Sequence, residues 1–84
     1  MKEKFEVEYT PLFLKRIENL DREAKVRILR EIKTLESNPY AGKPLRGELK
    51  GIFSLRIGDY RVLYQIKGNK LLLLAVGHRK HIYK

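Results

Sequence analysis

Two arginines and a histidine in the second half of this 84-residue chain have the types and spacing of a phosphate-binding site. Arg56 and Arg61 stand on either side of a Gly-Asp pair, and His78 lies near the C-terminus. Guanidinium groups bind phosphate oxygens through paired hydrogen bonds, and an imidazole can exchange a proton near neutral pH. We therefore expect anion binding and proton transfer if the fold brings these side chains together.

Further cations surround these three residues in the sequence. Residues 40–51 hold three of the six glycines and predict an irregular connector. The segment 77–83 follows the last apolar run and ends in a phenol. The side chains that these two segments add are Lys43, Arg46, Lys50, Arg79, Lys80, His81 and Tyr83.

The net charge of +9 is concentrated in one half of the chain. Residues 1–42 carry 9 Lys and Arg against 8 Asp and Glu, whereas residues 43–84 carry 10 against 2. Such an asymmetry favours an anionic partner: nucleic acid first, an acidic protein segment second and an anionic membrane surface third. The alternative is that the excess of lysine serves only solubility.

Several classes of site and location are excluded by composition. The chain has no cysteine, which excludes a disulfide, a thiol nucleophile and a cysteine-based zinc site. No histidine pair has metal spacing and no glycine-rich phosphate loop is present, so we expect no metal and no cofactor. The N-terminus lacks the apolar region of a secretory signal, and the longest apolar run, residues 71–76, is too short for a membrane span. These features predict a cytoplasmic protein without a membrane partner.

The elements that must position the basic residues follow from hydrophobic spacing. Alternation predicts a strand at residues 5–9, and Thr10 and Asp21 are predicted N-caps of two helices. Strand-like runs follow at residues 52–57, 60–66 and 71–77, joined by Gly-Asp and Gly-Asn turns. The prediction is one α+β domain over residues 1–84, ordered β-α-α-β-β-β, with the N-terminal strand and helical hairpin packed on one face of an antiparallel meander sheet.

The two turns also predict a register. A two-residue turn at Gly58 places Arg56 opposite Arg61, on the sheet face away from the helices. A two-residue turn at Gly68 pairs Arg61 with Val76 and places His78 diagonally beside Arg61 on that face. Opposed like charges leave three interpretations: separate solvation, a bound anion, or an ion pair of one arginine with Asp59 or Glu48.

The chain resembles a known family in several motifs at once. These are Pro44-Leu45-Arg46-Gly47, then Leu55-Arg56-Ile57-Gly58-Asp59-Tyr60-Arg61-Val62-Leu63-Tyr64, then Val76-Gly77-His78-Arg79 and a tyrosine near the end. Together they resemble the RelE branch of the RelE/ParE toxins, over essentially the whole chain. The resemblance implies the RelE-like microbial RNase fold and metal-free cleavage of messenger RNA in the ribosomal decoding site, by attack of the ribose 2′-hydroxyl on the adjacent phosphate.

The resemblance also implies roles for individual residues. Arg61 matches the family arginine that clamps the phosphate, Arg79 the one that assists the leaving group, and Tyr83 the tyrosine that orients or stacks the substrate. His78 joins them as a catalytic candidate. The predicted RNA-binding residues are Lys43, Arg46, Lys50, Arg56, Lys80 and His81.

The general base departs from the family pattern. Two family lysines, one of them proposed as the base, fall here at Ile52 and Ser54. Candidates for the base are Lys50, His78 or a ribosome-held water, and a further interpretation is that the arginines position the substrate without any protein base.

Partners and alternative functions also follow from the resemblance. It implies a cognate RelB-like antitoxin, in a heterodimer or heterotetramer, with the ribosome and messenger RNA as targets. An apolar strip of Leu63, Leu72 and Leu74 would suit the antitoxin, unless the chain's own C-terminus covers it. The alternatives are a ParE-like inhibitor of DNA gyrase and a non-catalytic RNA-binding relative.

Overall fold

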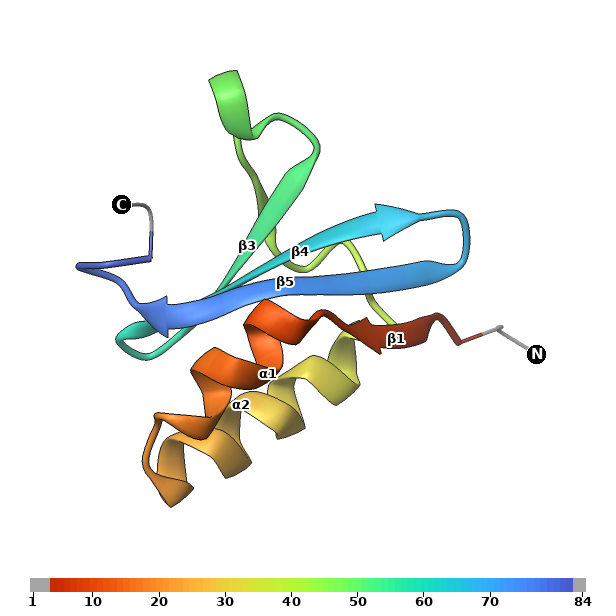
Figure 1. The fold of residues 1–84 in the computed structure, drawn as a ribbon. Helices are drawn as coiled ribbons and strands as arrows, with labels where there is room; N and C mark the ends of the chain where they lie inside the picture. Colours follow the sequence, from red (N-terminus) through yellow and green to blue (C-terminus); the bar gives the residue numbers. More distant parts are fainter. Residues whose placement is uncertain (1–3, 83–84) are drawn as a thin grey trace.

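The computed structural model describes residues 4–82, which form a five-stranded sheet with two helices packed against one face (Figure 1). This confirms the predicted α+β class and the order of the main elements. Along the chain the elements are β1 (Glu6–Tyr9), α1 (Pro11–Glu18), α2 (Arg22–Leu35), β2 (Lys43–Pro44), the short 3-10 helix η1 (Gly47–Leu49), β3 (Ile52–Ile57), β4 (Tyr60–Lys67) and β5 (Lys70–His78).

Both helices begin at the predicted caps. The Thr10 hydroxyl accepts a 3.3 Å hydrogen bond from the N–H of Phe13, and the Asp21 carboxylate accepts one of 2.8 Å from Ala24. Each cap satisfies a backbone donor that the first turn leaves open, which stabilises a helix by about 1 kcal/mol. Thr10 also donates to the carbonyl oxygen of Leu73 at 2.8 Å, so the start of α1 is fixed to β5.

The sheet extends the predicted meander at both edges. Its strand order is β1-β5-β4-β3-β2, in which β3, β4 and β5 are antiparallel neighbours. Strand β1, predicted to pack with the helices on one face of an antiparallel sheet, instead joins the edge of the sheet parallel to β5, so the sheet is mixed. The two residues of β2 pair with Ser54 and Phe53 at the opposite edge. Part of the connector that the glycine content predicts as irregular is therefore a short edge strand, where Pro44 is tolerated.

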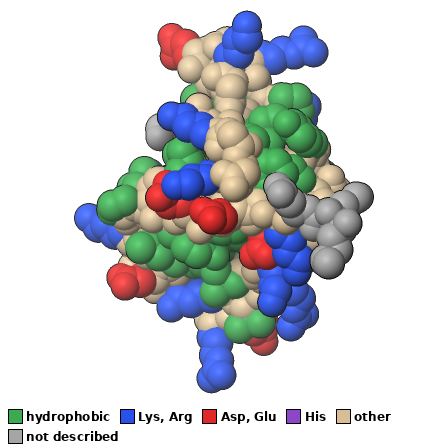
Figure 2. All heavy atoms as spheres, turned by 90° about the vertical axis from the view of Figure 1, so that its right-hand side faces the viewer, with side chains coloured by type: hydrophobic (Ala, Val, Ile, Leu, Met, Phe, Trp, Pro, Cys, Tyr) green, Lys and Arg blue, Asp and Glu red, His purple; other side chains and the backbone are tan. Residues whose placement is uncertain are grey.

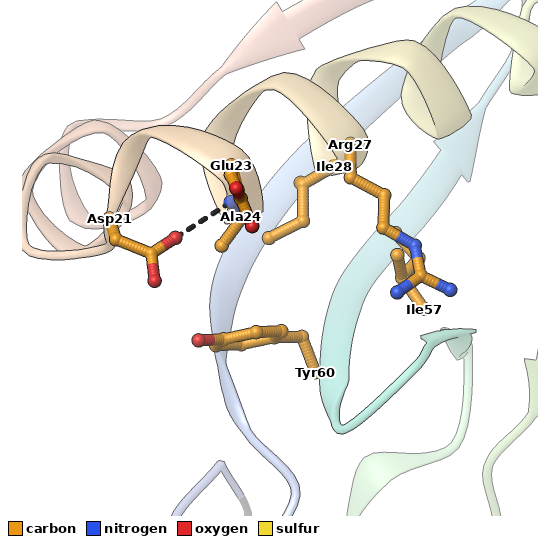
Figure 3. Close-up of a pocket in the computed structure, with 7 residues that line it drawn as sticks. All are labelled: Asp21, Glu23, Ala24, Arg27, Ile28, Ile57 and Tyr60. Carbon is orange, nitrogen blue, oxygen red and sulfur yellow. Dashed lines mark hydrogen bonds between the residues drawn. The ribbon is translucent and has the colours of Figure 1, made fainter.

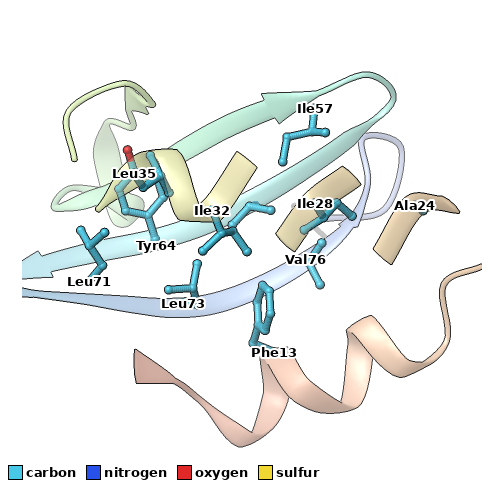
Figure 4. Close-up of a cluster of buried hydrophobic side chains, with 11 residues drawn as sticks. Phe13, Ala24, Ile28, Ile32, Leu35, Ile57, Tyr64, Leu71, Leu73 and Val76 are labelled. Carbon is cyan, nitrogen blue, oxygen red and sulfur yellow. The ribbon is translucent and has the colours of Figure 1, made fainter. Parts of the chain in front are cut away.

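The core lies between the helices and the sheet (Figure 4). Helix α2 contributes one stripe of side chains, and the strands contribute alternate residues, as the period of each element predicts. Burying each large apolar side chain stabilises the fold by roughly 1.5–3 kcal/mol. The buried residues of this cluster are Phe13, Ala24, Ile28, Ile32, Leu35, Ile57, Val62, Tyr64, Leu71, Leu73 and Val76.

The register is as predicted in the first hairpin and wrong in the second. Arg56 pairs with Arg61 across the turn between β3 and β4. Between β4 and β5 an irregularity shifts the pairing, so that Arg61 pairs with Gly77 and His78 pairs with Tyr60. The extra residue of a β-bulge changes the face of every later side chain. The prediction that His78 lies beside Arg61 is therefore wrong.

The sheet face away from the helices, called here the open face, carries a second, smaller apolar cluster. Leu63, Ala75 and Ile82 are its buried members, and Leu74 packs against them. Ile82 is only 6% exposed, because the turn after β5 folds it against Leu63 and Ala75. The chain's own C-terminal turn thus covers part of the predicted antitoxin strip. Within residues 4–82, no helix is long and apolar enough to span a membrane.

Candidate functional site

A depression of about 630 Å³ on the open face brings together three cations from three strands. Lys43 of β2 pairs with Ser54 of β3, and Arg56 of β3 pairs with Arg61 of β4, so all four side chains share one face. The remaining lining residues are Ala41, Leu45 and Leu55, and none of the seven is acidic. We call this feature the cationic depression. Its charge suits an anion such as phosphate.

Arg61 is held against the turn that it follows. Its Nη1 donates to the carbonyl oxygens of Gly58 at 3.1 Å and Tyr60 at 2.9 Å. A guanidinium has five N–H donors, so these two bonds leave Nε and Nη2 available to a ligand. Because the backbone fixes one side of the group, Arg61 can present the other side to a phosphate with little further ordering.

Arg79 is fixed to the same turn through its backbone. Its N–H donates to the carbonyl oxygen of Asp59 at 2.8 Å, and its Nε lies 3.9 Å from the Asp59 carboxylate. Both side chains of this ion pair are more than half exposed, so the pair contributes about 0–1 kcal/mol. Asp59 was one of the two acidic residues considered as an ion-pair partner of Arg56 or Arg61. In the structure it pairs with Arg79 instead.

His78 lies on the other side of the sheet. Its ring centroid is 6.1 Å from that of Tyr60, and its Nδ1 accepts a 3.1 Å hydrogen bond from the backbone N–H of Lys80. The His78 carbonyl oxygen accepts from the N–H groups of His81 and Ile82, which closes the turn after β5. The structure thus brings Arg56 and Arg61 together and leaves His78 outside the cationic depression.

The remaining predicted RNA-binding residues lie in two exposed turns. Arg46 and Lys50 flank η1, which projects at one end of the molecule in Figure 1. Figure 2 shows Lys and Arg side chains at this end together with an acidic side chain, and η1 itself contains Glu48. Lys80 and His81 lie in the turn after β5. Tyr83, predicted to orient the substrate, lies outside the described residues. No group of three histidine, aspartate or glutamate side chains in the described part of the chain is arranged to hold a metal ion.

Tyr64 fixes the segment that carries Lys43, a role that the sequence did not reveal. Its buried hydroxyl donates to the carbonyl oxygen of Pro39 at 2.7 Å and accepts from the N–H of Gly42 at 2.9 Å. Burial raises the pKa of the Tyr64 phenol above its ordinary value, while the Gly42 bond acts in the opposite direction. The sequence offered only the general rule that a buried tyrosine hydroxyl requires a hydrogen-bond partner, and this rule does not identify the partner.

A smaller pocket of about 200 Å³ lies on the helix side of the same hairpin (Figure 3). Asp21, the N-cap of α2, and Glu23 and Arg27 of α2 line it together with Tyr60 of β4. Arg27 packs so closely on the turn that a Cβ at Gly58 would lie 2.9 Å from its Nη1. Acidic and basic groups are mixed here, so the pocket lacks the uniform positive charge of the cationic depression.

Comparison with known proteins connects this geometry to a family. Residues 7–83 match the family model described as the ParE toxin of the type II toxin-antitoxin system parDE. Two curated relatives from Mycobacterium tuberculosis are similar: Toxin RelG, 51% identical over 51% of this chain and 52% of the relative, and Toxin RelE, 40% identical over 60% and 55%. The chain thus spans about half the length of the curated relatives it matches.

A solved structure extends the similarity over nearly the whole fold. The toxin-antitoxin complex RelBE2 from Mycobacterium tuberculosis contains a chain that is 32% identical, with a TM-score of 0.85, over 90% of this chain and 99% of that one. The family model covers most of the chain, including β3, β4, β5 and both turns that hold Arg61 and Arg79. The chain therefore belongs to the ParE toxin family of type II toxin-antitoxin systems, within the RelE/ParE superfamily.

Proposed function

We propose that this toxin is an endoribonuclease that cleaves messenger RNA on the ribosome in the cytoplasm. The observation that carries the proposal is the cationic depression, which Lys43, Arg56 and Arg61 line together and whose seven lining residues include no acidic one. A bound phosphodiester would offset the repulsion between the opposed arginines, which otherwise destabilises this part of the sheet.

The reaction is an internal transfer at phosphorus. The ribose 2′-oxygen bonds to the adjacent phosphorus as the 2′-hydroxyl loses its proton, and the bond to the 5′-oxygen breaks. Free Nε and Nη2 donors of Arg61 stabilise the negative charge that grows on the phosphate oxygens. Arg79 stabilises the departing 5′-oxygen, which takes a proton from water, and Tyr83 orients the adjoining base. We assign no catalytic role to His78, because it faces Tyr60.

The remaining basic residues bind the RNA backbone in this proposal. Arg46 and Lys50 at the η1 end, and Lys80 and His81 after β5, extend positive charge beyond the depression. Phosphate contacts of this kind position a nucleic acid without reading its sequence. A RelB-like antitoxin would inhibit the toxin in a heterodimer or heterotetramer, as the similarity to the RelBE2 complex suggests.

Primer extension on messenger RNA in a purified translation system tests this function. The wild type should cut within codons only when ribosomes are present. Arg61→Ala and Arg79→Ala should each lower the cleavage rate by roughly 100-fold or more, the usual cost of removing a donor to a transition-state oxyanion. Arg30→Ala, on the exposed side of α2, is the matched control and should cut like the wild type.

Inhibition of DNA gyrase is the second candidate, because the matching family model is named for the ParE toxin. The same protein preparations should therefore be added to a gyrase supercoiling assay. Intact messages together with inhibited supercoiling would replace the ribonuclease proposal with the gyrase one. RNA binding without cleavage or gyrase inhibition would instead identify a non-catalytic RNA-binding relative.

A further inference from the structure

We propose that Lys43 is a catalytic residue, whose amine accepts the proton of the attacking 2′-hydroxyl. This inference rests on the ribonuclease proposed above and names the base that the reaction requires. Lys43 is the cross-strand neighbour of Ser54 and lines the cationic depression beside the arginine pair. An RNA phosphate bound by Arg61 would therefore place its ribose within the same depression.

The chemistry of the lining groups singles out Lys43. The side chains in the depression that carry nitrogen or oxygen are those of Lys43, Ser54, Arg56 and Arg61. Arginine stays protonated in proteins, and a serine hydroxyl is a very weak base. An amine that has lost its proton has a free lone pair, and lysine is used as a general base in other enzymes.

The other protein candidates for the base lie elsewhere. His78 pairs with Tyr60, and its Nδ1 already accepts the N–H of Lys80. Lys50 follows η1 and is not among the residues that line the depression. Neither side chain therefore shares the site that holds Arg56 and Arg61.

The backbone of Lys43 is fixed by the contacts of its neighbours. The Tyr64 hydroxyl binds the backbone of Pro39 and of Gly42, the residue directly before Lys43. The pairing of Lys43 with Ser54 fixes the register of β2 on β3. Gly42 fits against the phenol so closely that an added Cβ would lie 2.6 Å from the Tyr64 oxygen. A well-fixed backbone with a flexible side chain suits a group that must reach a ribose hydroxyl and move a proton.

The proposed step is balanced in atoms and charge. Lys43 enters the step as the neutral amine, after its ammonium form has released one proton to water. The proton of the 2′-hydroxyl then moves to Nζ of Lys43 as the 2′-oxygen bonds to phosphorus. The bond from phosphorus to the 5′-oxygen breaks, and that oxygen takes a proton from water. Lys43 then returns its proton to water, so no metal or redox partner enters the cycle.

The absence of cysteine makes a selective chemical test possible. Lys43→Cys introduces one thiol. Alkylation with 2-bromoethylamine converts it into a side chain that ends in a primary amine and differs from lysine only in having sulfur in place of the γ-methylene group. A parallel sample is alkylated with 2-bromoethyl trimethylammonium, which restores the positive charge and cannot accept a proton. Lys33→Cys, exposed on α2, receives both treatments as the control. Circular dichroism checks the fold of every sample.

Cleavage rates are then compared by primer extension. Lys43→Cys should cut roughly 100-fold or more slowly than the wild type, because a general base contributes at least that much. Aminoethylation should restore most of the rate, whereas the trimethylammonium group should not. Equal rescue by both groups, or undiminished cutting by Lys43→Cys, would overturn the assignment and leave the ribonuclease standing. Absence of cutting by the wild type itself would overturn both.

Discussion

Arg79 donates its backbone N–H to the carbonyl oxygen of Asp59, and this 2.8 Å bond joins the chain after β5 to the turn between β3 and β4. The preceding carbonyl oxygen of that turn, on Gly58, accepts from Nη1 of Arg61. Two successive peptide groups thus hold Arg61, which we propose binds the phosphate, and Arg79, which we propose stabilises the leaving group. The geometry of the candidate site depends on this turn.

Substitution of Gly58 should weaken both stability and cleavage. Gly58 has a φ of +59°, where a side chain costs roughly 1–2 kcal/mol, and an added Cβ would also meet Arg27. We expect Gly58→Ala to lower the free energy of unfolding in urea by about that amount and to reduce cleavage, because the shifted turn no longer holds the arginines.

Gly68→Ala is the matched control for that experiment. Gly68 has the same φ of +59° in the turn between β4 and β5, and no atom of residues 4–82 beyond its chain neighbours lies within 4 Å of an added Cβ. It should therefore lose a similar stability and still cut RNA at the wild-type rate. Equal loss of cleavage in both variants would show that stability alone, and not the arginine-bearing turn, governs the activity.

Removal of the Tyr64 hydroxyl should destabilise the protein and displace Lys43. Tyr64→Phe keeps the ring, which stacks on Phe53, and leaves buried groups of Pro39 and Gly42 without their partner. A buried group left unpaired costs about 1–3 kcal/mol, which urea unfolding can measure. Cleavage should also fall, since β2 carries Lys43. Tyr40→Phe, at a tyrosine that is 67% exposed, should change neither quantity.

The same phenol predicts a loss of stability at alkaline pH. Burial raises the pKa of Tyr64 above the value of 10.0 that an unfolded chain has, so folding favours the neutral phenol. Its stabilising contribution is complete below pH 10 and is lost as the pH rises through the folded-state pKa. The free energy of unfolding, measured in urea between about pH 8.5 and 11.5, should therefore fall less steeply with pH for Tyr64→Phe than for the wild type.

A second tyrosine provides the comparison for this pH series. The pKa of Tyr9 is raised by burial and by the negative charge of Glu36. Tyr9→Phe should therefore also flatten the alkaline slope, and the double variant should flatten it further. If Tyr64→Phe has the same slope as the wild type while Tyr9→Phe differs, the alkaline loss arises from Tyr9.

Local signals predicted the parts of the fold that depend on neighbouring residues. The Gly-Asp turn fixed the opposition of Arg56 and Arg61, and the helix caps at Thr10 and Asp21 marked both helix starts. The parallel pairing of β1 with β5 has no such signal, because it joins segments distant in sequence. The irregularity in β5 was also hidden, since the continuous apolar run at residues 71–76 has no alternation in which an extra residue would show.

The misplaced histidine yields a direct test of the observed register. His78 faces Tyr60, and its Nδ1 accepts the N–H of Lys80. Asparagine can offer its side-chain oxygen near the position of Nδ1, so His78→Asn should preserve this turn while removing the imidazole. We expect its cleavage rate, measured across pH 6 to 9, to follow the wild-type profile. A loss of roughly 100-fold without loss of stability would instead show that the imidazole takes part in proton transfer. That result would require a β5 register in which His78 reaches the open face beside Arg61.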